Sequence, residues 1–110
     1  MYGYVCGMTS TVFDVVAEPA RRGLLDLLMR SGALPVGELA ARTGLSQPNT
    51  SRHLRVLRDA GLVECRAVGQ QRVYAVRGEG FADLARWLAP YVRLWQSGLG
   101  ALEEHLDRTE

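Results

Sequence analysis

The amino-acid sequence predicts a mainly α-helical domain with one small β-hairpin. Apolar residues recur at helical spacing in several segments, and proline, serine and glycine stand where those segments begin and end. Two short runs of strand-forming residues flank Gly69-Gln70, a two-residue connection that is typical of a hairpin. The 110 residues, 47% of them hydrophobic and 23% charged, fit one globular domain and are too few for two. We expect residues 1–9 to form a disordered tail and residues 10–110 to form the domain.

Two helices are expected at the beginning of the domain. The first covers Ser10 to Ala17, and it should end there because Pro19 disfavours the helical conformation in the residue before it. Pro19 then opens the second helix, in which four leucines recur at helical spacing up to Arg30. Ser31-Gly32 supplies the break that follows this helix.

The next two helices are short and lie close together in the chain. Val36 to Thr43 is long enough for two helical turns, and Gly44 stands where a helix commonly ends with a left-handed residue. Ser46 is a good N-cap for the following helix, which should run to about Ala60. Two short helices joined by a turn of a few residues have the outline of a helix-turn-helix, here at about residues 36–60.

The predicted hairpin follows the second of these helices directly. Its strands are Val63–Val68 and Gln71–Val76, both rich in residues that favour an extended backbone. A hairpin in this position forms a wing beside the helix-turn-helix, at about residues 63–76.

A long amphipathic helix is expected at about residues 79–108. Apolar residues recur along it in steps of three and four with polar residues between them. We expect Pro90 to kink or split this helix, and Gly98 and Gly100 to weaken it. The apolar stripe exceeds what one small domain needs to cover itself, so we assign it to a dimer seam rather than to internal core. The stripe consists of Phe81, Leu84, Leu88, Tyr91, Trp95, Leu99, Leu102 and Leu106, with Trp87 nearby.

Charge is unevenly distributed along the chain, although the formal net charge is only +1. Residues 1–45 are neutral, residues 46–77 carry +4, and residues 78–110 carry −3. A basic excess in one third of a small domain is expected for a face that binds phosphates. On charge alone, a solvated surface with accidental asymmetry remains an alternative.

The helix from Ser46 to Ala60 has two different faces at 100° per residue. Thr50, Leu54 and Leu57 form one stripe, which should pack into the domain. The opposite stripe consists of Pro48, Asn49, Arg52, Arg55 and Asp59, with Gln47 and Ser51 on its shoulders.

Forked hydrogen-bonding groups on that outward stripe are suited to reading base edges. Arginine bridges O6 and N7 of guanine, and asparagine or glutamine bridges N6 and N7 of adenine. Arg52 and Asn49 are therefore the first candidates for base contacts, followed by Gln47 and Ser51. A solvated helix face is the alternative. His53, on the flank, suits either a phosphate or base contact or simple packing.

Two further groups of polar residues have expected roles outside this helix. Arg66, Gln70, Gln71 and Arg72 crowd the hairpin, where a wing tip would contact a neighbouring phosphate backbone or a minor groove. Cations near a helix N-terminus are unfavourable, so Arg21 and Arg22 should serve an ion pair with Glu18 or, as the alternative, a phosphate contact.

Four ordered motifs together make the sequence similar to the ArsR/SmtB family of small bacterial winged-helix transcriptional repressors. The resemblance covers about residues 10–106. The motifs are EPARRGLLDLL at 18–28, PVGELAARTG at 35–44, LSQPNTSRHLRVLRDAGLV at 45–63 and GQQRVYAV at 69–76.

The resemblance implies a homodimer that represses transcription until an effector releases it from DNA. The first and last helices would form the dimer, so Val12 and Phe13 join the seam residues named above. The second helix of each helix-turn-helix would enter successive major grooves of a near-palindromic operator in double-stranded DNA. By position, the family's recognition-helix motif falls on Ser46, Gln47, Asn49, Ser51, Arg52 and His53, and its wing falls on Arg66 to Arg72.

The known metal-binding motifs of the family are missing, so we expect no metal and no cofactor. Arsenic and cadmium sensors carry paired cysteines in the helix before the turn, where this chain has Pro35 to Ala40. Zinc-type sensors need several ligands on the last helix, which here has the single histidine His105. Cys6 and Cys65 are too few for a disulfide scaffold. A small organic effector, a redox signal through these cysteines, a non-standard metal or thiol site, and no effector all stay open.

Two classes of function survive and a third is excluded. The first is a DNA-binding repressor, and the second is a winged-helix module that binds another protein. The outward stripe favours DNA because protein-binding modules tend to expose an apolar patch there. An enzyme would need a nucleophile with a base, a carboxylate pair or a phosphate-binding glycine loop, and the sequence has no such set. No signal peptide or membrane span is evident, so we expect a cytoplasmic protein without a membrane partner.

Overall fold

The computed structural model describes the backbone of residues 12–109 and the side chains of residues 12–99. The expected disordered tail at 1–9 and Cys6 lie outside the described residues, as do the side chains of Leu102 and His105. The elements in chain order are α2 (Val12–Ala17), α3 (Pro19–Ser31), β1 (Leu34–Pro35), α4 (Val36–Thr43), α5 (Gln47–Asp59), β2 (Val63–Val68), β3 (Gln71–Val76), the 3-10 helix η1 (Gly78–Phe81) and α6 (Ala82–Thr109). This order confirms the predicted mainly α-helical fold with a hairpin.

The helix-turn-helix is built by local signals at its turn. Gly44 follows α4 in the left-handed conformation, with φ 78° and ψ 4°, and its N–H donates to the carbonyl of Ala40. The Ser46 hydroxyl then caps α5 by accepting a hydrogen bond of 3.2 Å from the Asn49 N–H. These two residues stop one helix and start the next within a few positions, so α4 and α5 are held at an angle.

The hairpin belongs to a three-stranded antiparallel sheet with the order β1-β3-β2. Strands β2 and β3 pair from Val63 opposite Val76 to Val68 opposite Gln71, as the sequence predicts. Strand β1 was not predicted. It is only two residues long and pairs Leu34 with Tyr74, so its extended conformation depends on a partner forty residues away in the chain.

The core lies between the helices and the root of the sheet. Its fully buried side chains include Leu54 and Leu57 of α5, and Thr50 on the same stripe is also buried. At 100° per residue, Val56 falls outside the stripe of Thr50, Leu54 and Leu57. It is nevertheless half-buried and packs against the core, since the apolar stripe of α5 is wider than three residues.

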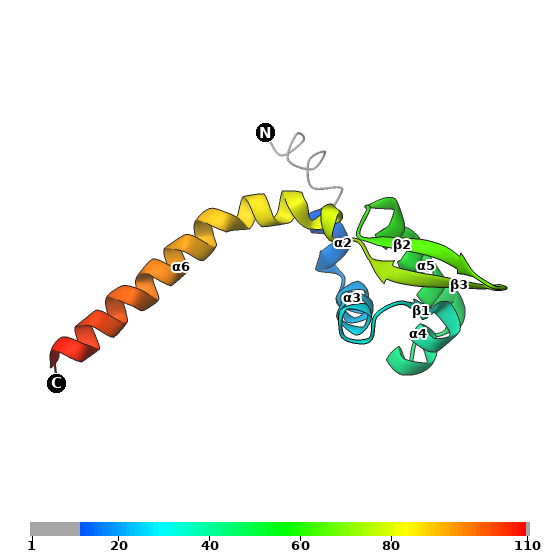
Figure 1. Ribbon diagram of the computed structural model, residues 1–110, viewed down its shortest axis with the longest axis horizontal. Helices are drawn as coiled ribbons and strands as arrows, with labels where there is room; N and C mark the ends of the chain where they lie inside the picture. Colours follow the sequence, from blue (N-terminus) through cyan, green and yellow to red (C-terminus); the bar gives the residue numbers. More distant parts are fainter. Residues whose placement is uncertain (1–11, 110) are drawn as a thin grey trace.

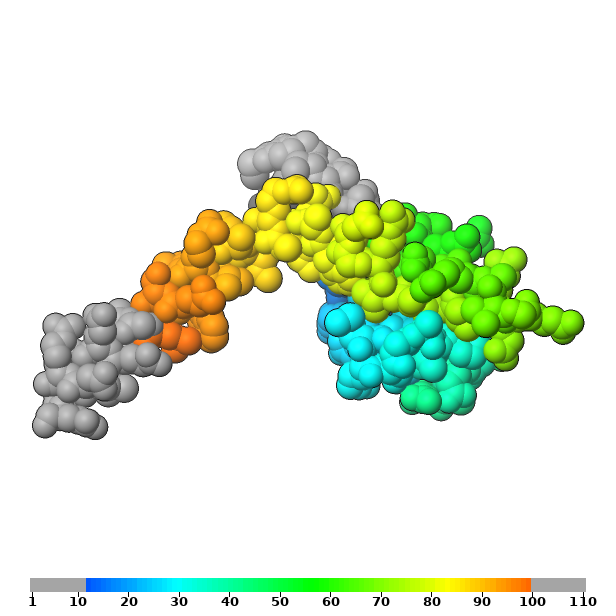
Figure 2. All heavy atoms as spheres, viewed as in Figure 1, coloured from blue at the N-terminus to red at the C-terminus, as the bar shows by residue number. Residues whose placement is uncertain are grey.

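Helix α6 runs without a break through Pro90, so of the two predicted outcomes at this residue, a kink or a split, the split is wrong. Figure 1 shows α6 leaving the body of the domain as a curved arm. The Cα radius of gyration is 18.5 Å, whereas a compact domain of this size has about 13 Å. The space-filling view shows the same arm projecting away from the rest of the chain (Figure 2). The arm therefore leaves much of its surface without intramolecular contacts.

Backbone packs directly on backbone where α6 begins. A Cβ atom built on Gly80 would lie 2.1 Å from the carbonyl oxygen of Gly61, which follows α5. The Arg77 N–H also donates to the Leu62 carbonyl at 2.8 Å. The start of the long arm is thus joined to the end of α5.

Replacing Gly80 with alanine should lower the free energy of unfolding by about 1 to 3 kcal/mol, because the methyl group forces these two backbone segments apart. Urea denaturation at one fixed protein concentration would measure the change. Gly78→Ala is the matched control, since nothing lies within 4 Å of a Cβ at Gly78. Equal stability of the two variants would contradict the close packing at Gly80.

Candidate nucleic-acid interface

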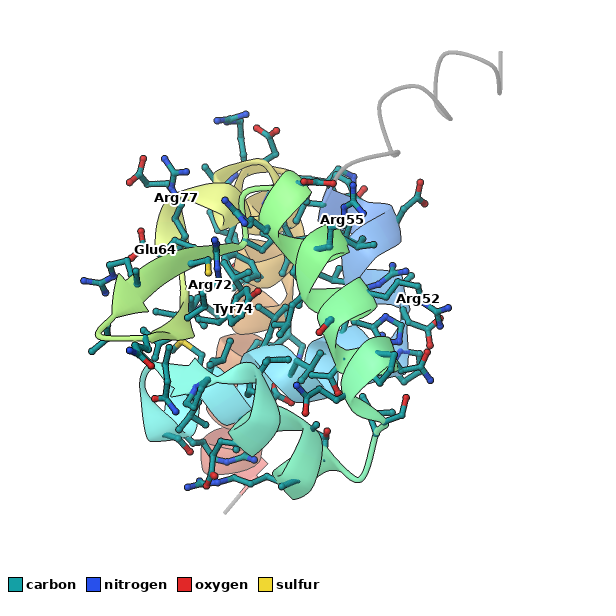
Figure 3. All side chains as sticks on the ribbon, turned by 90° about the vertical axis from the view of Figure 1, so that its right-hand side faces the viewer. Arg52, Arg55, Glu64, Arg72, Tyr74 and Arg77 are labelled. Atoms are coloured by element: carbon teal, nitrogen blue, oxygen red, sulfur yellow. The ribbon has the colours of Figure 1, made fainter. Side chains whose placement is uncertain are left out.

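Helix α5 presents a polar, partly basic surface to solvent. Gln47, Ser51, Arg52 and Arg55 are exposed, and Asn49 and His53 are half-buried. Figure 3 shows the Arg52 and Arg55 side chains extending from the outward side of α5, away from the sheet. We call the residues Gln47, Asn49, Ser51, Arg52 and Arg55 the α5 face.

The two first candidates for base contacts are bonded to each other. Arg52 donates from Nη2 to the Oδ1 atom of Asn49 over 2.5 Å. This hydrogen bond uses one of the two lone pairs on the oxygen that Asn49 would offer to N6 of adenine. It also fixes one end of the Arg52 guanidinium and leaves the rest of its fork directed outward. The sequence analysis considered Arg52 and Asn49 separately, whereas in the structure a hydrogen bond couples their side chains.

Ser46 is the N-cap that the sequence predicts, whereas the surroundings of His53 were not indicated by its spacing. The Ser46 hydroxyl accepts the N–H of Asn49, so its role in the described structure is to start the helix. The Nδ1 atom of His53 is buried and has no hydrogen-bond partner among the described residues.

The wing carries exposed arginine and glutamine side chains. Arg72, Gln70 and Gln71 are exposed, while Arg66 forms an ion pair of 3.5 Å with Glu64. Arg72 lies over the sheet on the side that faces the viewer in Figure 3. Val68 at the hairpin tip is 60% exposed, a feature that sequence reasoning missed because a strand valine is normally assigned to a buried face.

Tyr74 of β3 faces Cys65 of β2 across the sheet. Burial raises the pKa of Tyr74 above its ordinary value of 10.0, and a hydrogen bond with the Cys65 thiol raises it further. Arg58 and Arg72 act in the opposite direction because each cation favours the phenolate. The phenol is therefore uncharged at neutral pH, and Cys65 is half-buried beside it.

The expected ion pair of Arg21 or Arg22 with Glu18 is wrong, and the alternative, a phosphate contact, stays a prediction. Arg22 donates from Nη1 to the carbonyls of Val16 and Ala17 at 2.8 and 3.0 Å, and neither arginine forms an ion pair with Glu18. Arg21 reaches the carbonyl of Val15 at 3.4 Å. The last carbonyls of α2 lack partners in their own helix, so they bind these cations.

The residues predicted for the dimer seam fall into two groups. Val12 is 2% exposed in the core of its own chain, so it has almost no surface for a partner. Phe13 is half-buried, and its ring meets Trp87 edge to face with centroids 5.6 Å apart. Phe81 and Leu84 are also half-buried against the core. The members that remain exposed are on the arm: Leu88, Tyr91, Trp95 and Leu99.

Sequence reasoning missed part of the apolar surface of the arm. Leu94 is 71% exposed and Val92 is also exposed. Both lie beside the predicted stripe. The prediction considered only apolar residues three or four positions apart, and such residues mark the centre of the stripe. The arm is therefore apolar over a wider angle than a narrow coiled-coil seam.

No group of three or more histidine, cysteine, aspartate or glutamate side chains within the described part of the chain is placed to hold a metal ion. None of the helices that the structure describes is long and apolar enough to cross a membrane.

A turn-linked helix pair with a polar second helix and an adjoining hairpin defines the winged helix-turn-helix class. A family model described as a helix-turn-helix domain matches residues 16–66. The HTH-type transcriptional regulator Rv2034 of Mycobacterium tuberculosis is 36% identical over 95 residues, which cover 86% of this chain and 85% of that protein. The crystal structure of the ArsR family transcriptional regulator RHA00566 matches with a TM-score of 0.64 at 34% identity, over 77% of this chain and 87% of that one. The chain belongs to the ArsR family of transcriptional regulators.

Two more comparisons describe what such proteins do. The transcriptional repressor SdpR of Bacillus subtilis is 29% identical over 83 residues, 76% of this chain and 91% of that protein. The homodimeric winged helix-turn-helix DNA-binding domain Mb0332 of Mycobacterium bovis has a TM-score of 0.57 at 32% identity, over 76% of this chain and 73% of that one. The chain is a DNA-binding transcriptional regulator, and the comparisons point to regulators rather than to a class of enzyme.

Proposed function

We propose that this regulator is a homodimeric repressor that binds a near-palindromic operator and is released from it by an effector. The observation that carries the proposal is the α5 face, with Asn49, Arg52 and Arg55 directed to solvent in the segment of net charge +4. Forked polar groups on a helix of this kind suit the major groove, and the positive charge suits the phosphates around it. A DNA-binding regulator acts where the DNA is, which places it in the cytoplasm.

Each candidate residue has a defined part in this proposal. Arg52 and Asn49 contact base edges as a coupled unit, with Gln47 and Ser51 beside them and Arg55 farther along the helix. Ser46 and His53 lie at the start and flank of this surface. The wing adds affinity through contacts with the phosphate backbone or the minor groove and does not contribute much to sequence recognition. Its contact residues are Arg66, Gln70, Gln71 and Arg72.

The proposed dimer uses the exposed apolar surface of the α6 arm. Leu88, Tyr91, Trp95 and Leu99 lack enough contacts within their own chain, and a second arm would cover them. Residues 36–60 and 63–76 would then bind DNA while residues 79–108 join the protomers. A two-fold axis would place the two recognition helices about 34 to 36 Å apart, one helical turn of DNA. A footprint over a single half-site would contradict this arrangement.

Fluorescence anisotropy with DNA from the upstream region of the chain's own gene tests the function. Binding at least about a thousandfold tighter than to a scrambled duplex, with a steep dependence on salt, is expected of a specific regulator. Weak and equal binding to both duplexes, measured without added metal, would leave two options: a required co-ligand, or a module that binds protein.

Replacing Arg52 with alanine should weaken operator binding by about 1 to 3 kcal/mol and relax the preference at one base position. The reason is the loss of a forked donor set on the α5 face together with its bond to Asn49. Anisotropy against operators that carry each base at each position would measure both effects. Equal losses on operator and random DNA would remove Arg52 from the residues that read sequence.

Arg72→Ala is the matched control for Arg52→Ala, since both changes remove one exposed arginine. It should weaken binding to every sequence alike and reduce the slope of log affinity against log salt by about one. A selective loss on the operator would show instead that the wing reads bases.

A further inference from the structure

A groove of about 560 Å³ lies beside α3, and no residue of the α5 face lines it. Its walls come from α2, α3, the end of β3, η1 and the first turn of α6. Apolar side chains line most of it, among them Val16, Leu25, Met29, Phe81 and Leu84. Grooves of this size, mostly apolar with a few polar groups, are typical of sites for small molecules.

The two charged residues in the groove differ in what they already bind. Arg22 donates to the carbonyls of Val16 and Ala17, so its charge lies against the partly negative end of α2. Asp26, one turn farther along α3, forms no hydrogen bond or ion pair with any residue that the structure describes. Arg22 therefore keeps its charge but uses donors on the end of α2, whereas the carboxylate of Asp26 has no partner among the described residues.

We propose that this groove binds a small apolar molecule that carries one basic amine. The apolar body would cover Leu25, Met29 and Leu84, and the ammonium group would pair with Asp26. A carboxylate on the same body would face Asp26 and be repelled, and a neutral analogue would gain only the apolar contacts.

The position of the groove connects it with DNA binding, and this part of the inference rests on the proposed function. Phe81 and Leu84 belong to the segment where α6 begins, and Gly80 in that segment packs on Gly61 at the end of α5. A molecule in the groove contacts α3 and the segment where α6 begins. Through the packing of Gly80 on Gly61, a shift of that segment would be passed on to the end of α5. Binding of the molecule therefore changes the affinity for the operator.

Isothermal titration of the full chain with three matched probes tests the site without DNA. The probes are 1-naphthylmethylammonium, 1-naphthylmethanol and 1-naphthoate, which share one apolar body and differ in charge. The ammonium should bind at least about threefold more tightly than the carboxylate, the scale of one exposed ion pair. Asp26→Asn should abolish this preference, and Asp14→Asn, an exposed change on α2 outside the groove, should preserve it.

A second variant separates binding in the groove from binding elsewhere. Met29 is 71% exposed and lines the groove, so Met29→Ala should leave the fold intact and weaken all three probes alike. Absence of ammonium binding, or a charge preference that survives in Asp26→Asn, would overturn the proposal. Sedimentation at the same concentrations would also overturn it if the ammonium bound only as the dimer dissociated, because a second copy would then occupy the groove.

Operator binding is measured separately with and without saturating 1-naphthylmethylammonium. A change of at least about fivefold in affinity is expected for a coupled site. Unchanged affinity would overturn the regulatory part of the proposal. If the chain bound no operator at all, the proposed function would fail, and the titrations would still decide whether the groove binds the amine.

Discussion

Replacing Leu54 with alanine should lower the free energy of unfolding by about 2 to 5 kcal/mol. Leu54 is 0% exposed and belongs to the main apolar cluster, which also contains Leu57 of α5 and the four core leucines of α3. Its truncation removes buried apolar contacts and leaves a cavity, since a packed core relaxes only partly. Urea denaturation followed by circular dichroism, at one protein concentration for all variants, would measure the loss.

Arg55→Ala is the control on the same helix. Arg55 is exposed on the α5 face, so its replacement should change stability by less than about 0.5 kcal/mol. A loss below about 1 kcal/mol for Leu54→Ala would contradict the assignment of this stripe to the core. The same two variants also separate stability from DNA binding, because only Arg55 lies where DNA is proposed to contact α5.

Replacing Trp95 with alanine should raise the dissociation constant of the proposed homodimer about thirtyfold or more, the effect of a strong interface residue. Trp95 is 64% exposed in the single chain and lies near the centre of the apolar stripe on the arm. In a two-fold dimer the change is made twice, once on each protomer. Sedimentation equilibrium over a range of concentrations would measure the constant.

Arg93→Ala provides the comparison on the opposite face of the arm. Arg93 is exposed. Each residue of a helix is rotated by 100° from the one before it, so Arg93 points away from the apolar side of the arm on which Val92 lies. We expect its replacement to leave the dimer almost unchanged. If both variants dimerised like the original chain, the seam would not lie on this stripe of α6.

Much of the fold could be predicted because its signals are local. Gly44 and Ser46 end and begin helices through bonds to residues three or four positions away, so neighbouring residues suffice to indicate them. The hairpin strands were predicted at Val63–Val68 and Gln71–Val76, where the structure has them, because their connection is only two residues long. The outward direction of Arg52 and Arg55 follows from helical periodicity alone.

Other features could not be predicted because their partners are far away in the chain. β1 is extended only because β3 pairs with it, and a two-residue segment has no periodicity of its own. Arg22 binds the end of α2 rather than Glu18 because the fold brings unpaired carbonyls to it. Helix α6 continues through Pro90 although a proline removes one helical hydrogen bond, and the remaining bonds on either side keep the segment helical.

The sequence by itself determined the helices and the two hairpin strands, the buried stripe of α5 at Thr50, Leu54 and Leu57, and the family that the motifs resemble. Those properties depend on spacing and on contacts within a few residues. The tertiary structure alone decided that Val12 is used inside its own core, that Asn49 and Arg52 share a hydrogen bond, and that Gly80 rests on Gly61. It also assembled the groove beside Asp26 from five elements. The physical reason is that packing brings together residues that are far apart in the chain, and the spacing of residues within one segment does not indicate which distant segment will contact it.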